Sequence, residues 1–380
     1  MTARIQTAIG LMSGTSMDGV DVALVETDGD SVLRLGPTHF LPYADADRAL
    51  LRRALGDAVG LTQRDTRPGC LAEAEACVTA RHAEAVEAFL AAHGIDRGRV
   101  DVVGFHGQTV LHRPADRLTV QIGDAALLSR NLRLPVAHDF RGDDVAAGGE
   151  GAPLVPVFHR ALVEAAGLET PLALVNIGGV ANVTYIAAPG IDPTACDTGP
   201  GNALIDDLMA ERTGTALDRD GVLALSGRVD TTLLARLLEH PYFERPAPKS
   251  LDRNTFSRSL VDDLATADAA ATLVAFTAES ISRTLARLGP VRRVVVCGGG
   301  ARNPAILRAL AARLGQPVET AEGVGWSADF AEAQAFAFLG VRVLRGLPLT
   351  FPTTTGVPRA MTGGRLAGMT TSALASPATD

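Results

Sequence analysis

The feature that most constrains the fold is a repeated pattern in which two short apolar runs flank a turn of small residues. The first copy has apolar runs at 7–12 and 20–26, joined by a turn rich in Gly and Ser. The second copy has apolar runs at 172–177 and 181–186, joined by two glycines. Each copy predicts a β-hairpin with a glycine-lined tip. Two hairpins that lead two halves of the chain indicate two related lobes.

Strands and helices alternate along the rest of the chain, which predicts mixed or parallel sheets covered by helices on both faces. Apolar residues at helical spacing predict helices at 46–58, 71–93, 124–130, 203–212, 267–288, 303–314 and 329–345, and short apolar runs predict strands at 100–105, 119–122 and 291–296. We expect a loop at 191–202, an irregular surface segment at 240–258 and an extended segment at 350–355. The predicted lobes are 1–140, with a segment of about 350–368 that returns to it, and 141–349; the tail 369–380 is predicted to be disordered.

Composition excludes several classes of protein. The chain has 380 residues, of which 47% are hydrophobic and 21% charged, as in globular proteins that bury a core. The 43 acidic and 35 basic residues give a net charge of -8, which argues against a nucleic acid partner. The four cysteines lack zinc-ligand spacing, and no apolar run approaches the ~20 residues of a membrane span. We therefore expect a cytoplasmic protein without a membrane segment; a homodimer is left open.

The first hairpin turn is a candidate phosphate site. Ser13, Thr15 and Ser16 offer hydroxyls, and Gly14 lets the backbone come close to a ligand. Such a tip can present several N–H donors to a phosphate, and Asp18 with Asp21 could hold a magnesium ion through water. A plain turn explains the same residues equally well, and the Lys of a Walker A loop is absent.

Two further glycine turns and one aspartate loop complete the candidates. The turns are 176–182 and 297–303, and neither is the G-x-G-x-x-G of a dinucleotide fold. In the segment Asp197-Thr-Gly-Pro-Gly-Asn202, Pro and Gly constrain the direction of an aspartate, as a general base requires. A helix N-cap is the plainer interpretation, although the helix is expected to begin only five or six residues later.

His106 and His112 lie at even spacing, so they could share one face of a strand. A zinc pair would need a third ligand, and none is evident, which favours a structural or substrate-contacting role. Arg141 and Glu150 lie in a polar, glycine-rich stretch where burial is not expected. Arg141 could clamp a carboxylate or phosphate, or it could be a solvated charge.

The ordered set GLMSGTSMDGVD, GFHGQTVLHRP, TVQIGD, DFRGDDVAAGGEGAPLVP, NIGGVANVT, CDTGPGNALID, CGGGARN and GWSADFAEAQAFAF resembles the anhydro-N-acetylmuramic acid kinase family from about residue 9 to 364. PKSLDRNTF also fits, although Asp252 stands where many members have Gly, and Glu150 where Gln is frequent. The resemblance implies an actin/hexokinase-like (ribonuclease H-like) α/β fold of two lobes, with ATP in the cleft between them. It also implies that water opens the 1,6-anhydro ring while ATP, with Mg2+, phosphorylates O6, which gives N-acetylmuramic acid 6-phosphate.

The resemblance also suggests a role for each motif. Asp197 would be the base that activates water. The expected ATP contacts are Gly14, Thr15, Ser16, Met17, Asp18, Gly19, Val20, Asp21, Asn176, Gly178, Gly179, Gly298, Gly299 and Gly300. The expected sugar contacts are His106, Gln108, Arg141 and Lys249, and the metal candidates are Asp18 and Glu332. The alternatives are a kinase that phosphorylates a hydroxyl of another sugar and a nucleotide-switched binding protein of the actin or chaperone kind.

Overall fold

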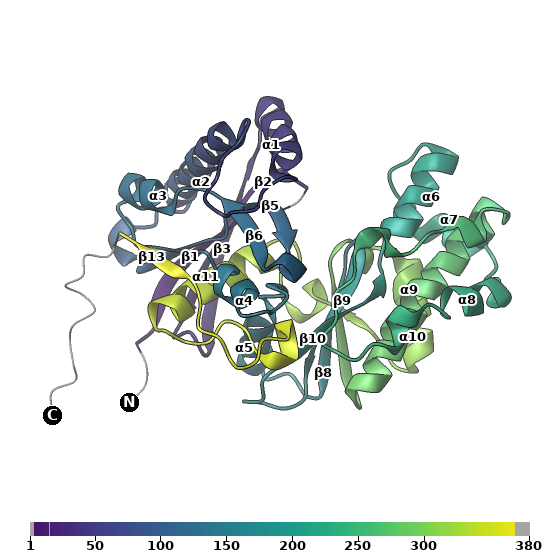
Figure 1. Cartoon of the computed structure of the whole chain (residues 1–380). Coiled ribbons are helices and arrows are strands. Elements are labelled where there is room, and N and C mark those ends of the chain that lie inside the picture. Colours follow the sequence, from purple (N-terminus) through teal and green to yellow (C-terminus); the bar gives the residue numbers. More distant parts are fainter. Residues whose placement is uncertain (1–3, 15, 369–380) are drawn as a thin grey trace. The chain divides into compact units, whose positions relative to one another are not determined.

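The computed structural model describes residues 4–14 and 16–368. Thr15 and the tail 369–380, about which the sequence makes predictions, therefore lie outside the described residues. The chain divides into two compact units. The first unit runs to Ala166 and resumes at Phe330, and the second spans Gly167–Asp329 (Figure 1).

The first unit is built on a six-stranded mixed sheet with the order β13-β7-β4-β1-β2-β3. Strands β1, β4 and β7 are parallel, whereas β2, β3 and β13 pair antiparallel with their neighbours. The strands are β1 (Gln6–Met12), β2 (Gly19–Thr27), β3 (Val32–Pro42), β4 (Val102–Phe105), β7 (Val136–His138) and β13 (Arg365–Ala367); β5 (Gln108–Arg113) and β6 (Leu118–Ile122) form a separate two-stranded sheet. The helices are α1 (Asp45–Ala58), α2 (Leu71–His93), α3 (Ala125–Leu132), α4 (Gly142–Ala146), α5 (Pro156–Ala165), α11 (Ala331–Leu344) and α12 (Pro352–Thr355).

Successive side chains of β1 point to opposite faces of this sheet, and helices cover both faces. Ile9 and Leu11 belong to the same buried cluster as Val78 and Phe89 of α2. Gly10, which lies between them in the sequence, faces the backbone of α11 instead. The first hairpin, formed by β1 and β2, and the helices α1 and α2 form as the sequence predicts.

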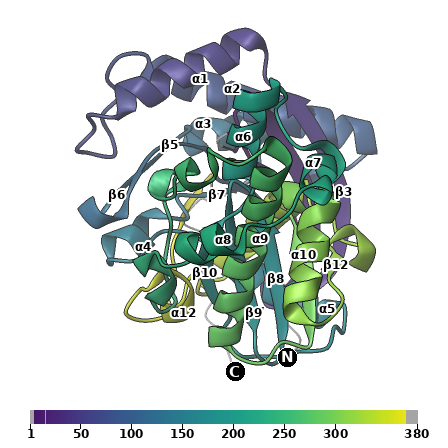
Figure 2. The same cartoon turned by 90° about the vertical axis from the view of Figure 1, so that its right-hand side faces the viewer.

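The second unit contains a five-stranded mixed sheet with the order β10-β9-β8-β11-β12. Its strands are β8 (Leu172–Ile177), β9 (Val180–Ile186), β10 (Thr194–Pro200), β11 (Arg293–Cys297) and β12 (Glu319–Thr320), and its helices are α6 (Ala203–Thr213), α7 (Val222–Ser226), α8 (Thr231–Leu237), α9 (Thr266–Leu288) and α10 (Pro304–Leu314). Strands β8, β11 and β12 are parallel, and β8 and β9 form the predicted second hairpin. Figure 2 shows α9 and α10 side by side in this unit. Short 3₁₀ turns occur at Arg97–Arg99, Pro114–Asp116, Arg219–Gly221, Pro241–Glu244, Arg253–Thr255, Ser259–Val261, Gly299–Arg302 and Glu322–Val324.

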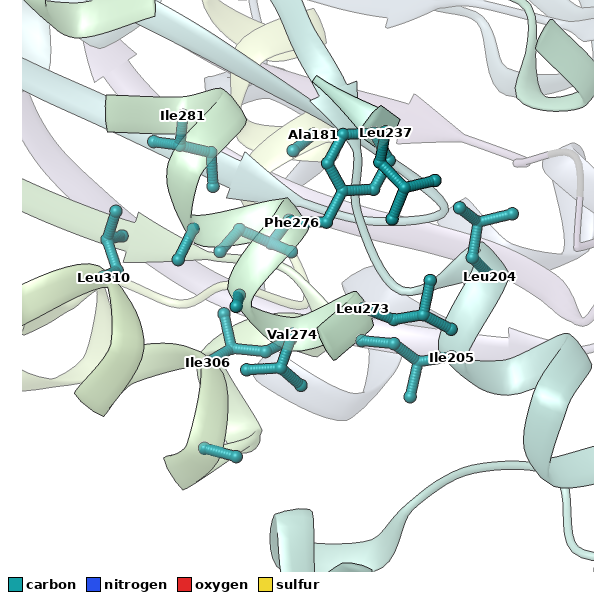
Figure 3. Close-up of a cluster of buried hydrophobic side chains, with 14 of the residues drawn as sticks. Ala181, Leu204, Ile205, Leu237, Leu273, Val274, Phe276, Ile281, Ile306 and Leu310 are labelled. Carbon is teal, nitrogen blue, oxygen red and sulfur yellow. The ribbon is translucent and has the colours of Figure 1, made fainter. Parts of the chain in front are cut away.

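The core of the second unit lies around α9 (Figure 3). Leu273 and Phe276 of α9 pack with Leu204 of α6 and with Ile306 of α10. The predicted α/β class, with mixed sheets flanked by helices, is confirmed.

Three local predictions are wrong. The expected loop 191–202 contains strand β10, because this segment pairs antiparallel with β9 along most of its length. The expected extended segment 350–355 contains the helical turn α12, at whose start Phe351 N–H donates to Thr354 Oγ1 over 3.0 Å. The expected surface segment 240–258 carries Tyr242 and Phe256, which are buried in the core of the second unit.

The two units also divide elsewhere than at the predicted positions 140 and 349. Helix α5 packs on α11, and the rings of Phe158 and Phe338 lie 5.6 Å apart. Both helices contact the sheet of the first unit, so 141–166 and 330–349 belong there. The segment expected to return to the first unit pairs with it through β13 and β7. Within the described residues no helix has the length and apolar character needed to cross a bilayer, and the cellular location stays a prediction.

Candidate active site

The candidate residues of the first unit gather at the carboxyl ends of its parallel strands. Ser13 follows β1, His106 follows β4, and Arg141 lies three residues after β7. Ligands of α/β sheets bind at this edge, because loops rather than helices cover it. A cavity of about 460 Å³ opens here. It is lined by Met12, Ser13, Gly14, Ser16, His106, Gln108, Thr109, His112, Arg141, Ala152 and Glu332.

Hydrogen bonds within the unit brace the first hairpin turn. Ser13 Oγ donates to Gln108 Oε1 over 2.6 Å, so the hydroxyl of Tyr43, 3.0 Å away, donates to Ser13. Gln108 Nε2 in turn donates to the carbonyl of Gly14 over 3.2 Å. The buried Gln108 therefore fixes the shape of the turn from below. Sequence reasoning missed Tyr43, because nothing local connects it to residue 13.

The predicted ATP contacts of this turn differ in what they expose. Among the described residues, a Cβ at Gly14 would come within 4 Å only of Ser16, whose Oγ would lie at 3.5 Å and whose backbone nitrogen at 4.0 Å. Ser16 and Asp18 are exposed, and Ser16 Oγ donates to Asp18 Oδ1 over 2.8 Å. In contrast, the side chains of Met17 and Val20 are buried in the core.

Gly19 and Asp21, two further predicted ATP contacts, have structural roles in the sheet. A Cβ at Gly19 would strike the ring of Phe40 on β3, so packing explains this glycine. Asp21 lies on β2, paired with Met12 and Phe40, and is half-buried. Gly14, Ser16 and Asp18 are therefore the described residues of the tip best placed to meet a phosphate or its metal.

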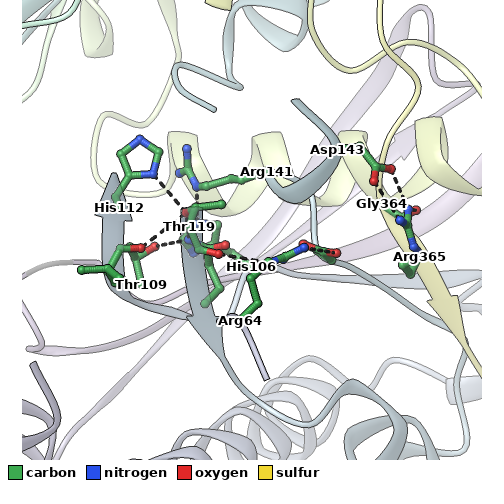
Figure 4. A network of polar contacts seen from close by, with 12 residues as sticks. Arg64, His106, Thr109, His112, Thr119, Arg141, Asp143, Gly364 and Arg365 are labelled. Atoms are coloured by element: carbon green, nitrogen blue, oxygen red, sulfur yellow. Dashed lines mark hydrogen bonds and ion pairs between the residues drawn. The ribbon is translucent and has the colours of Figure 1, made fainter. Parts of the chain in front are cut away.

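Arg141 and His106 form a directed pair (Figure 4). Arg141 Nε donates to His106 Nε2 over 3.0 Å, so this ring nitrogen carries no proton. The proton is on Nδ1, which donates to the carbonyl of Gly107 over 2.8 Å. Burial and the charge of Arg141 hold the pKa of His106 well below its usual value, which agrees with a neutral ring. The two predicted histidines lie on different segments, since His112 is on β5 and bonds Thr119 Oγ1.

The carboxylate of Glu332 faces the same cavity from the first turn of α11. Burial raises its pKa, and the nearby charge of Arg141 opposes the increase. In the described part of the chain, no three His, Cys, Asp or Glu residues are grouped to hold a metal ion. Mg2+ usually takes one or two carboxylates and completes its shell with water and substrate phosphates. Asp18 or Glu332 alone would supply one carboxylate, which fits that pattern.

In the second unit, Asp197 is placed by a β-bulge. The register of β10 against β9 shifts between Asp197 and Gly199. A bulge re-aims a side chain within a strand, so the local glycines serve a bent strand, where a loop was predicted. Leu251 N–H donates to Asp197 Oδ2 over 2.7 Å, and Asp197 N–H donates to the carbonyl of Lys249 over 2.9 Å. The segment 249–251 thus holds both the backbone and the carboxylate of Asp197.

Tyr242 is a further support of Asp197 that the sequence analysis missed. Its hydroxyl donates to the carbonyl of Asp197 over 2.6 Å. The ammonium of Lys249 lies 4.3 Å from the centre of the Tyr242 ring and donates to the Tyr242 carbonyl over 3.2 Å. Burial lowers the pKa of Lys249. The predicted base Asp197 and the predicted sugar contact Lys249 therefore lie in one network. The only indication of Tyr242 in the sequence is an aromatic residue within a segment that was predicted to lie on the surface.

The two glycine turns of the second unit meet at the carboxyl ends of β8 and β11. Cys297 is in register with Asn176, and a Cβ at Gly298 would strike the side-chain oxygen of Asn176. Gly298 also has a positive φ of 77°, which suits glycine. The predicted adenosine motif, Gly298 to Gly300, therefore lies directly against the second hairpin.

The start of α6 closes on the tip of that hairpin. Asn202 N–H donates to the carbonyl of Gly178 over 2.7 Å, and Gly201 N–H donates to that of Gly179 over 2.9 Å. Asn202 Nδ2 donates to the carbonyl of Ile177 over 3.1 Å. The three motifs that the sequence placed far apart in this unit, 176–180, 197–202 and 298–301, are neighbours in space.

Comparisons with known proteins cover nearly the whole chain. The family described as anhydro-N-acetylmuramic acid kinase matches residues 6–368. The anhydro-N-acetylmuramic acid kinase of Nitrobacter winogradskyi is 57% identical over 363 residues, which are 95% of this chain and 99% of the relative. That of Methylobacterium nodulans is 58% identical over 368 residues, 94% of this chain and 98% of the relative. Among solved structures, (R)-2-hydroxyglutaryl-CoA dehydratase component A of Acidaminococcus fermentans is similar with a TM-score of 0.45 and 12% identity, over 89% of this chain and 98% of that one. The chain belongs to the anhydro-N-acetylmuramic acid kinase family.

Proposed function

We propose that this chain uses ATP and water to convert 1,6-anhydro-N-acetylmuramic acid into N-acetylmuramic acid 6-phosphate and ADP. The observation that carries the proposal is the match of 94–95% of the chain to relatives named for kinase activity on this sugar. A kinase of this family uses ATP as its phosphoryl donor. The reaction would serve peptidoglycan recycling and amino sugar catabolism, because its substrate is a cell-wall sugar.

Asp197 is the proposed general base. It takes a proton from water as the water oxygen attacks C1 of the sugar. The bond between C1 and O6 then breaks, and O6 attacks the γ-phosphorus of ATP while ADP leaves. Ring opening thus creates the nucleophile where phosphoryl transfer needs it. The bonds from Leu251 to the carboxylate and from Tyr242 to the backbone support this role, because a base must be held in one direction.

The nucleotide contacts are proposed in each unit separately. In the second unit, the turns that contain Gly178 and Gly298 meet at the carboxyl ends of the parallel strands β8 and β11, where phosphates commonly bind. In the first unit, the proposed contacts at the tip are the half-buried Gly14 and the exposed Ser16 and Asp18. Mg2+, when bound, would neutralise charge on the phosphates, and Asp18 or Glu332 could orient its water ligands.

The sugar contacts are proposed around Arg141. Two of its nitrogens are already engaged by His106 and by the carbonyl of Gly151. Gln108 is a proposed sugar contact because it borders the cavity and holds the first hairpin turn. His106 contributes chiefly by orienting Arg141. Lys249 remains a proposed sugar contact; its support is its position within the network of Asp197.

The test is an assay with the anhydro sugar and ATP in ¹⁸O-water, in which both ADP and the sugar phosphate are followed. We expect one label at C1 and none in the phosphate ester. Product incubated without enzyme in the same water controls for exchange at C1. Phosphorylation of the intact anhydro sugar, or no label at C1, would support a kinase with simple hydroxyl chemistry and contradict coupled ring opening.

The same assay tests the base. Asp197→Asn keeps the acceptor for Leu251 but removes the basic carboxylate, so turnover should fall by about 10³-fold or more. Asp207→Asn is the matched control, because Asp207 is an exposed acid of the same unit that pairs with Arg253 on the surface. Its turnover should stay at the wild-type level. Full turnover in Asp197→Asn would remove Asp197 from the mechanism, and sugar-independent ATP hydrolysis alone would favour a nucleotide-switched binding protein.

A further inference from the structure

Arg141 is held in one orientation by two acceptors. Nε donates to His106 Nε2 over 3.0 Å, and Nη1 donates to the carbonyl of Gly151 over 2.6 Å. Within the part of the chain that the structure describes, Nη2 makes no hydrogen bond. A guanidinium is planar and rigid, so two fixed acceptors determine where its remaining N–H groups point. The position of the Gly151 carbonyl is therefore part of the site.

That carbonyl lies on a glycine-rich loop, 147–151, which is fastened to Asp144. Asp144 Oδ1 accepts from Gly151 N–H over 2.6 Å, and the Asp144 carbonyl accepts from Gly149 N–H over 2.9 Å. A Cβ at Gly149 would strike the Asp144 carboxylate, so the loop lies directly on it. The carboxylate thus sets both the path of the loop and the place of the Gly151 carbonyl.

The second oxygen of Asp144 reaches the far end of the chain. Thr355 Oγ1 donates to Asp144 Oδ2 over 2.6 Å, and the Thr355 carbonyl accepts from Glu150 N–H over 2.8 Å. Asp144 and Thr355 are both buried. A buried carboxylate is costly unless its oxygens accept hydrogen bonds, and here each oxygen accepts one. The helical turn α12 therefore supports the loop as well, through Asp144 and through the N–H of Glu150.

The proposed reaction leaves Asp144 and Thr355 without a role. We infer that they are positioning residues for Arg141: they hold loop 147–151 so that the Gly151 carbonyl and His106 aim the Nη2 side of the guanidinium at an oxygen of the sugar. The inference rests on the proposed function in one respect, namely that Arg141 contacts the sugar. Burial lowers the pKa of Arg141. The nearby charges of Glu332 and then Asp144 oppose this effect, because they favour the charged form of Arg141.

The experiment compares Asp144→Ala and Thr355→Val with wild type for both substrates. We expect KM for the anhydro sugar to rise by about tenfold or more, and KM for ATP to change by less than about twofold. Thr355→Ser keeps the hydroxyl and should restore the sugar KM. The matched control is Asp143→Ala, because Asp143 lies on the same short helix but pairs with Arg365 of β13 (Figure 4). Its sugar KM should stay at the wild-type value.

A double-mutant cycle with Arg141→Lys tests whether Asp144 acts through Arg141. Lysine cannot keep both fixed donors, so adding Asp144→Ala to Arg141→Lys should cost little beyond the single substitution. Independent, multiplying losses would overturn the inference, and so would a lowered Tm with both KM values unchanged. If wild type does not turn over the anhydro sugar, the proposed function fails instead. Crystal structures then decide the inference, which is overturned if Asp144→Ala keeps the contact between Gly151 and Arg141.

Discussion

His82 is a buried histidine that the proposed chemistry does not use. It lies on α2, where Nδ1 donates to the carbonyl of Val78 over 2.7 Å and the ring meets the edge of Phe105 at 4.9 Å. Among the described residues, Nε2 has no hydrogen-bond partner. Burial lowers the pKa of His82 to about 4, so the folded protein keeps the ring neutral. Because His82 is buried and stays neutral in the folded protein, the free energy of unfolding depends on pH.

The sign of this dependence follows from the depressed pKa. Below about pH 6.5 the unfolded chain takes up a proton that the folded chain refuses, so stability falls as pH falls from about 6.5 to about 4. The loss from His82 should reach about 2 kcal/mol at pH 5. Urea denaturation at pH 7.5 and pH 5 measures it, and in His82→Leu the difference between the two pH values should shrink by that amount. An unchanged difference would show that His82 is protonated in the folded state.

Single residues could be predicted from sequence only where a motif contains them. Asp197 and Arg141 stand within short segments of characteristic composition, so the sequence alone makes both candidates, and their roles stay predictions. Asp144 lies in the same segment as Arg141, yet its hydroxyl partner is 211 residues away, and no local pattern reports such a contact. Tyr242 was missed for the same reason, because its importance comes from the backbone of Asp197, 45 residues earlier.

At the scale of elements, three glycines set how closely α11 lies on the sheet. A Cβ at Gly10 of β1 would strike the carbonyl of Ala333, and one at Gly104 of β4 would strike the carbonyl of Phe336. Gly340 of α11 meets Gly104 in return, with its hypothetical Cβ 3.2 Å from the Gly104 Cα. Close contact of helix and strands brings the first turn of α11, and Glu332 with it, to the edge of the sheet where the cavity opens.

We therefore expect Gly104→Ala to be destabilising, because the added methyl group meets backbone that cannot rotate away. Overpacking of this kind typically costs 1–3 kcal/mol, and we expect about 3 kcal/mol here. Gly56→Ala is the matched control: Gly56 lies exposed on α1, a Cβ there would meet nothing within 4 Å, and alanine should stabilise by about 0.5–1 kcal/mol. Thermal denaturation of both variants measures the two opposite shifts. Equal stability of Gly104→Ala and wild type would mean that α11 can move away from the sheet.

Elements with strong periodicity were predictable, and β10 was not. Helices α1, α2, α9 and α10 match their predicted ranges closely, because an amphipathic stripe recurs over several turns. The segment of β10 contains Asp, Thr, Gly and Pro, which are typical of turns. Its strand conformation comes from pairing with β9 and from the bulge at Asp197, and both depend on a neighbouring strand.

For the whole molecule, the repeated hairpin pattern predicted two units but could not place their limits. Each unit has its own buried cluster, one centred on α2 and β1 and the other on α9. The chain passes from the first unit to the second after Ala166 and back after Asp329. Helices α5 and α11 join the first unit through packing between segments more than 160 residues apart, which composition along the chain does not indicate.

The backbone groups proposed to hold the nucleotide and the loop that orients Arg141 lie in different segments of the chain, so each ligand should protect its own set of backbone amides from hydrogen exchange. We expect ADP alone to slow exchange at 176–180 and 298–302 in the second unit, since the proposed phosphate and adenosine contacts are backbone groups there. The anhydro sugar alone should slow exchange at 149–151 in the first unit, because it engages Arg141 and so steadies the Gly151 carbonyl. Helix α2 serves as the internal control, and its exchange should be the same in all samples. Protection of 149–151 by ADP and of 298–302 by the sugar would reverse the proposed assignment of the two ligands.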